Sequence, residues 1–107
     1  MIEKIYNLTV GNERVTEKVV DDDHVNINHV ILNKEEALPI HYANSNAYLA
    51  ILRGRITVQF NDADTNEYGY GNVIAVPYKT KMNVSNQNDE VLEFFVFKSP
   101  NPRHYEK

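Results

Sequence analysis

The sequence has no cysteine and no tryptophan among its 107 residues, and glycine and proline occur only four times each. The lack of cysteine excludes disulfides, thiolate nucleophiles and cysteine-ligated zinc, and it fits a reducing compartment. The chain also lacks a GxSxG elbow, a phosphate-binding loop, a dinucleotide fingerprint and an HExxH motif. We therefore do not expect an enzyme of the classes that depend on these motifs.

Long apolar runs are missing as well. The longest, AYLAIL at residues 47–52, is far below the roughly 18 residues that a membrane span needs. The first ten residues, MIEKIYNLTV, contain no continuous apolar core of signal-peptide length. We therefore expect a cytoplasmic protein with no membrane partner.

Basic residues are outnumbered by acidic ones, with 11 Lys and Arg against 15 Asp and Glu and a net charge of −4. A net negative charge repels nucleic acids at long range, so we expect no nucleic-acid partner. Apolar residues make up 42% of the chain and charged residues 24%, as in ordinary folded proteins. This length and composition predict one domain, residues 1–107, with one hydrophobic core.

Short segments of alternating or continuous apolar residues run along the whole chain. They predict strands at residues 2–10, 14–20, 25–32, 47–52, 56–60, 73–76, 82–86 and 91–98. Polar turns are expected at residues 61–67 and 87–90, and Gly54 marks a tight hairpin between two of the strands. The one helix-like window, residues 33–38, is too short to form a stable helix. The pattern therefore predicts an all-β fold that is closed or built from two sheets.

Two segments carry a family resemblance. PIHYANSNAYLAILRG, residues 39–54, resembles the first motif of the cupin superfamily, with His41 and Gly54 at its first histidine and its glycine. GNVIAVPYKTKMNVSN, residues 71–86, resembles the second motif. The residues that match this second motif are its glycine, proline and terminal asparagine, at Gly71, Pro77 and Asn86. The resemblance implies a cupin-type double-stranded β-helix, also called a jelly-roll barrel.

The chain departs from the family pattern at the metal ligands. The second histidine of the first motif falls on Ala43, its glutamate on Ala47, and the histidine of the second motif on Met82. Lys79 also stands where the second motif has a glycine. Because a tight divalent site needs about three N or O ligands, we expect no metal and no other cofactor at the inherited site.

The first functional hypothesis is a binding module with a small-molecule pocket inside the barrel. The predicted pocket residues are His41 and His29 as polar anchors, with Ala43, Ala47, Leu49, Ile51 and Met82 as the apolar lining. Burial in such a pocket would favour a neutral His41 that forms hydrogen bonds with an uncharged ligand.

The sequence allows two interpretations of His29. On the 25–32 segment it shares a face with Val25, Ile27 and Ile31, and if that face lines the barrel, it meets His41. The alternative is a partly buried histidine that forms a hydrogen bond with a neighbour.

Two further hypotheses remain open. The protein is a cupin enzyme of isomerase, lyase or dioxygenase type, in which His41 acts as a base or joins His29 and a carboxylate such as Glu93 in a rebuilt metal site. Otherwise the pocket is vestigial and the protein acts through its surface, as a dimer in which residues 2–10 add a strand to the partner's sheet. A homodimer is expected in every case.

Overall fold

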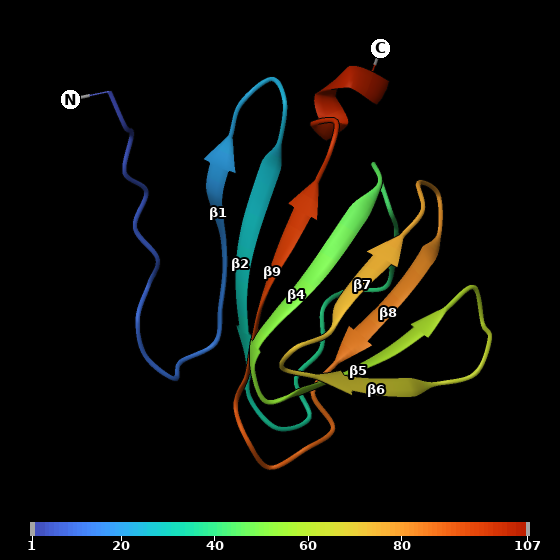
Figure 1. Cartoon of the computed structure of the whole chain (residues 1–107). Coiled ribbons are helices and arrows are strands. Elements are labelled where there is room, and N and C mark those ends of the chain that lie inside the picture. The colour runs from blue at the N-terminus through green and yellow to red at the C-terminus, as the bar shows by residue number, and fades with distance from the viewer. Residues whose placement is uncertain (1, 107) are drawn as a thin grey trace.

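The computed structural model describes residues 2–106 and is built almost entirely from antiparallel strands (Figure 1). Within these residues there are nine strands and one short 3-10 helix. They are β1 (Val15–Asp21), β2 (Asn26–Leu32), β3 (His41–Tyr42), β4 (Ala47–Arg53), β5 (Arg55–Phe60), β6 (Asn66–Gly69), β7 (Val73–Val76), β8 (Lys81–Ser85), β9 (Leu92–Lys98) and the helix η1 (Pro102–Tyr105). The prediction of an all-β fold is confirmed.

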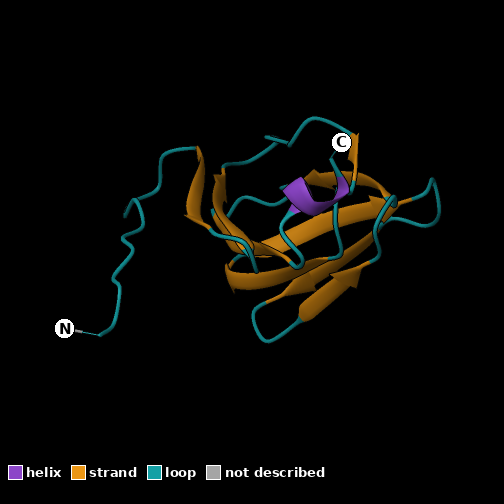
Figure 2. Ribbon diagram, turned by 90° about the horizontal axis from the view of Figure 1, so that it is seen from above, coloured by secondary structure: helices purple, strands orange, loops and turns teal. Residues whose placement is uncertain are grey.

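The strands form two sheets that face each other across a common core. One sheet has the order β1-β2-β9-β4-β7 and the other the order β3-β8-β5-β6. Seen from above, the two sheets close around the interior like the walls of a flattened barrel (Figure 2). The core between them is apolar, and its fully buried members include Leu32, Leu49, Ile56, Leu92 and Phe94.

Gly54 makes the hairpin between β4 and β5, as its place in the first motif suggested. Its φ is +77°, in the left-handed region that side chains with a Cβ rarely adopt. A Cβ at this position would lie 2.3 Å from the carbonyl oxygen of Val91. Both the conformation and the close approach of the loop before β9 therefore require glycine.

The second motif also retains its turn conformation and its buried terminal asparagine. Lys79 has a φ of +73°, so the turn retains the left-handed conformation of the glycine that it replaces. Asn86 is fully buried, and its side-chain amide donates to the carbonyl oxygens of Leu32 and Glu90 at 3.0 and 2.8 Å. Asn86 thus ties the end of β8 to β2 and to the loop before β9.

The strand predicted at residues 2–10 is wrong. The segment is extended but pairs with no strand of its own chain, and Figures 1 and 2 show it running away from the barrel beside β1. Ile2 and Ile5 are exposed, whereas Thr9 is bonded to the carboxylate of Glu17 through its backbone N–H and its hydroxyl. An alternating pattern supplies a strand-like chain, but a strand needs a neighbour to receive its hydrogen bonds.

A second difference concerns the turn predicted at residues 61–67. Its last two residues already belong to β6, which pairs with β5 from Asn66 opposite Val58 to Gly69 opposite Arg55. The sequence did not predict this short edge strand because the segment is polar. Side chains on an exposed strand can be polar on both faces, so no apolar alternation marks it.

No helix in the described part of the chain has the length and apolar character of a transmembrane span.

Candidate functional site

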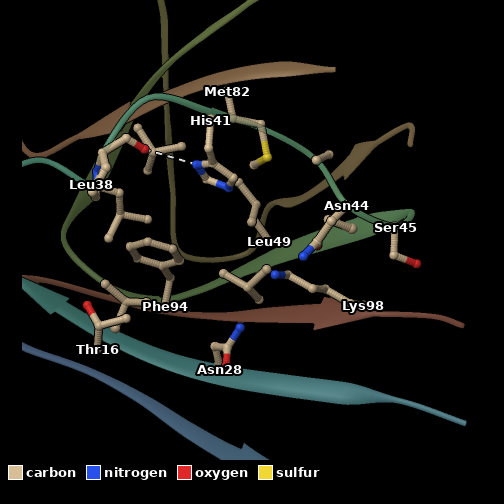
Figure 3. Close-up of a pocket in the computed structure, with 16 residues that line it drawn as sticks. Thr16, Asn28, Leu38, His41, Asn44, Ser45, Leu49, Met82, Phe94 and Lys98 are labelled. Carbon is tan, nitrogen blue, oxygen red and sulfur yellow. Dashed lines mark hydrogen bonds between the residues drawn. The ribbon is translucent and has the colours of Figure 1, made fainter. Parts of the chain in front are cut away.

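A cavity of about 210 Å³ lies between the two sheets, at the end of the barrel where β4 begins and β9 ends (Figure 3). Its wall is mostly apolar and comes from both sheets. The apolar lining includes Val30, Leu38, Ala43, Ala47, Leu49, Met82, Val84, Phe94 and Val96. Such a wall excludes water from the body of a bound molecule and leaves recognition to the few polar groups at the rim.

The four positions that correspond to the family's metal ligands come together at this cavity. His41 on β3 is paired with Met82 on β8, Ala47 faces them from the start of β4, and Ala43 lies in the loop between β3 and β4. Ala43, Ala47 and Met82 are all buried. The four positions that the motifs assigned to metal ligands therefore do lie together in the structure.

Five of the seven predicted pocket residues line the cavity: His41, Ala43, Ala47, Leu49 and Met82. Ile51 faces the interior from the same row of β4 as Ala47 and Leu49, but it packs in the core beyond the cavity. His29 lies elsewhere.

His29 is on the outer face of the five-stranded sheet, so its predicted place in the pocket is wrong. β2 pairs with β9 so that Val30 is opposite Phe94 and Leu32 is opposite Leu92, and these pairs face the core. Alternation then turns His29 outward. The rebuilt metal site of His29 with His41 is excluded by the same geometry.

On the outer face, the fully buried imidazole of His29 lies between two carboxylates. Nδ1 is 2.7 Å from Glu17 and Nε2 is 2.5 Å from Glu93, so each ring nitrogen has a carboxylate as its hydrogen-bond partner. The backbone N–H of Thr9, followed by the His29 ring, holds the pKa of Glu17 below its ordinary value. The alternative of a buried, hydrogen-bonded histidine is confirmed.

His41 lies at the open rim, and its side chain is exposed rather than buried as we expected. Nδ1 donates to the carbonyl oxygen of Pro39 at 2.9 Å, which is the dashed line in Figure 3. A carbonyl oxygen only accepts, so this bond assigns the proton to Nδ1 and leaves Nε2 of the neutral ring as an acceptor. At this site His41 is able to accept a hydrogen bond or a proton from a ligand.

Three polar residues at the same rim were not predicted: Asn28, Asn44 and Lys98. The most informative is Lys98, and a signal for it was present. In β9 the inward row is Leu92, Phe94 and Val96, and the next step of that alternation is Lys98. Burial, with a smaller effect from the charge of Lys18, lowers the pKa of Lys98 below its ordinary value.

The donor set at the inherited positions does not fit a divalent metal ion. It consists of one exposed imidazole, one thioether and two alanines, whereas catalytic sites for such ions use about three N or O ligands from the protein. Across residues 2–106, no group of three His, Asp or Glu side chains is arranged to hold a metal ion. The inherited positions therefore do not form a site for a divalent metal ion.

One curated relative and its crystal structure cover nearly the whole chain. The uncharacterised protein MJ0764 of Methanocaldococcus jannaschii is 41% identical over 104 residues, which are 96% of this chain and 90% of that protein. Its crystal structure is described as that of an RmlC-like cupin family protein with a double-stranded β-helix fold. It superposes with a TM-score of 0.95 at 40% identity, over 100% of this chain and 99% of that chain.

More distant structures share the fold alone. A cupin superfamily protein from Desulfitobacterium hafniense gives a TM-score of 0.72 at 14% identity, over 87% of this chain and 83% of that chain. The cupin domain of Cnp3 from Schizosaccharomyces pombe gives 0.73 at 15% identity, over 85% of this chain and 67% of that chain. No protein-family model matches the sequence. The predicted double-stranded β-helix is confirmed by the structural neighbours.

Proposed function

The chain belongs to the RmlC-like cupin family, and from this premise we propose that it binds a small molecule in the barrel cavity without the family's metal ion. The observation that carries the proposal is the apolar cavity itself. A barrel with a purely structural role would fill this space with its own side chains, because protein interiors are packed to crystal-like density. Here about 210 Å³ is left open beside the rim residues.

The size of the cavity limits the ligand. At about 210 Å³ it is smaller than the roughly 300–1,000 Å³ of sites for drug-sized molecules. Apolar cavities of about 150 Å³ stay dry and take up a single benzene molecule. The ligand body is therefore on the scale of one ring or a short branched chain.

The residues at the inherited positions support binding rather than metal chemistry. Ala43 and Ala47 have short side chains, which leave space at the rim. Met82 adds a flexible apolar side chain to the cavity wall. His41, with Nε2 as an acceptor, provides a polar contact at the mouth.

Binding is tested by blocking the cavity. Saturable amide shifts in ¹H–¹⁵N spectra are expected when benzamide or cyclohexanol is added, at Leu49 and Met82 first. Ala47→Leu fills the cavity and is expected to weaken this binding at least about tenfold, while Ala63→Leu in an exposed turn leaves it unchanged. Well-dispersed spectra of both variants show that they are folded.

Two results would contradict the proposal. The first is the absence of saturable binding by either probe in the wild type, and the second is equal binding by Ala47→Leu. The proposal that the protein binds its ligand without a metal ion is tested separately. Protein purified without chelator is expected to carry no stoichiometric metal by inductively coupled plasma mass spectrometry. Near-stoichiometric metal in the wild type that is lost in His41→Ala would overturn the proposal of metal-free binding.

A further inference from the structure

We propose that the ligand of this pocket is a small monocarboxylate with an apolar body, whose carboxylate is held at the rim by Lys98, Asn28 and Asn44. This inference rests on the proposed binding function and deepens it. It was not predicted from the sequence, where we expected an uncharged ligand.

The argument begins with the position of Lys98. β9 is paired with β4 so that Lys98 is directly opposite Ala47, and with β2 so that it is opposite Asn26. Residues opposite each other in an antiparallel pair have Cβ atoms about 5 Å apart. Because residue 47 is an alanine, its side chain leaves the space next to the lysine open. In Figure 3 the side chain of Lys98 extends into the mouth of the cavity, with Asn44 on one side and Asn28 on the other.

The ammonium group of Lys98 has no counter-ion in the part of the chain that the structure describes. Its side chain makes no hydrogen bond there, and no carboxylate of residues 2–106 lies within ion-pair distance. Nearby Asp21 is 2.7 Å from Arg103 and 3.7 Å from Lys18. Burial lowers the pKa of Lys98, because the charged form is less well solvated at the rim than in water.

The two asparagines at the rim are unengaged in the same way. The side chains of Asn28 and Asn44 make no hydrogen bonds with residues 2–106, whereas those of Asn46, Asn86 and Asn101 all do. Three side chains with N–H donors thus line the mouth of the apolar cavity. A carboxylate, which only accepts hydrogen bonds and carries one negative charge, complements this set of donors.

The surroundings favour a single negative charge and give the ligand an orientation. A polar depression adjoins the rim at Asn28, Asn44 and Lys98, and its lining also includes Lys18, Arg103, Asp21 and Glu106. Lys18 and Arg103 already lie within ion-pair distance of Asp21, so Lys98 is left to balance one negative charge of a ligand. The apolar body therefore points into the barrel and the carboxylate lies at the rim.

The test compares two ligands of nearly the same shape, benzoate and benzamide, by calorimetry and by ¹H–¹⁵N titration at pH 7. Wild-type protein is expected to bind benzoate about tenfold more tightly than benzamide, because a hydrogen bond to an ionised group is stronger than one between neutral groups. Lys98→Met keeps the length of the side chain without its charge, and it is expected to remove this preference while benzamide binding is retained. The matched control, Lys34→Met, changes an exposed lysine that pairs with Asp89 outside the cavity and keeps the preference.

A second variant tests the same contact from the opposite strand. Ala47→Glu places a carboxylate across from Lys98, where it is expected to form an ion pair and displace benzoate. A greater loss of benzoate binding in Ala47→Glu than in Ala47→Gln, which fills the same space without the charge, supports the proposal. Equal affinity for benzoate and benzamide in the wild type, or a benzoate preference that survives Lys98→Met, would overturn it and leave small-molecule binding standing. Failure of both ligands to bind the wild type would overturn both proposals.

Discussion

Gly54 and Lys79 have left-handed backbone conformations at two turns of the barrel. Comparing them separates the requirement for this conformation from the requirement for space around the Cβ position. At Lys79 the turn tolerates a Cβ in this conformation, since φ is +73°. At Gly54 the loop before β9 passes so close that a Cβ would overlap the carbonyl oxygen of Val91. The glycine of the first motif is thus required for both conformation and space, whereas at Lys79 the turn accepts the strain of a lysine in that conformation.

Gly54→Ala is expected to destabilise the fold by about 2 kcal/mol or more, from left-handed strain and from displacement of the 91–92 backbone. For a domain of this size that corresponds to a fall in Tm of roughly 10 °C, measured by thermal unfolding. The control is Gly69→Ala, where φ is not in the left-handed region and the nearest atom to the new Cβ would be the flexible end of Arg55 at 3.2 Å. Equal losses in the two variants would contradict this account.

Among the secondary-structure elements, the 3-10 helix η1 is held to the barrel by charges at the end of β1. The side-chain amide of Asn101 donates to the Asp21 carboxylate at 2.6 Å, and Arg103 lies 2.7 Å from it. These two contacts, with Asn101 the larger, lower the pKa of Asp21 to about 2. Tyr105 of the helix stacks on Tyr78 with ring centroids 4.1 Å apart, so the C-terminal tail also packs against the second motif.

This attachment predicts a pH dependence. The folded-state pKa of Asp21 lies below its ordinary value of 3.8, so its contribution to stability is present above pH 3.8 and is lost as the pH falls toward about 2. Between these values the resonances of Arg103 and His104 are expected to move toward those of a free tail in NMR spectra. Asp21→Asn should remove this transition and Asp64→Asn, in an exposed loop, should keep it. An unchanged transition in Asp21→Asn would show that another group releases the tail.

For the whole molecule, the expected homodimer stays a prediction, and the structure indicates which surfaces would make it. The first residues carry exposed Ile2 and Ile5 on a segment that has no partner strand in its own chain. The outer face of the five-stranded sheet also exposes Tyr48, Leu52 and Val73. Apolar groups left in water on an extended arm and on a sheet face are typical of a surface that a second copy covers.

The full chain is therefore expected to have the mass of a dimer in size-exclusion chromatography with light scattering. Changing both Ile2 and Ile5 to Asp should shift it toward the monomer, because burying two carboxylates in an apolar interface is costly. Thr65→Asp, in an exposed loop of the four-stranded sheet, adds charge elsewhere and should leave the mass unchanged. A wild-type chain that is monomeric at micromolar concentration would contradict the prediction.

The sequence alone determined the all-β class, most strands and the positions of the two motifs, because strand alternation and turn residues such as Gly54 and Gly71 act locally. It also located Ala43, Ala47 and Met82, since motif spacing along a hairpin carries over directly into space. These features depend on residues close together in the chain, where the pattern of side chains limits the backbone directly.

Only the tertiary structure decided which face of β2 is inside. Alternation assigns His29 and Asn28 to opposite faces, but the register with β9 places Asn28 at the cavity and His29 on the outer surface. The pairing of β4 with β9 sets Lys98 opposite Ala47. Residues 2–10 have no partner strand among the described residues. Such choices depend on contacts between segments far apart in the chain, which no local pattern of residues specifies.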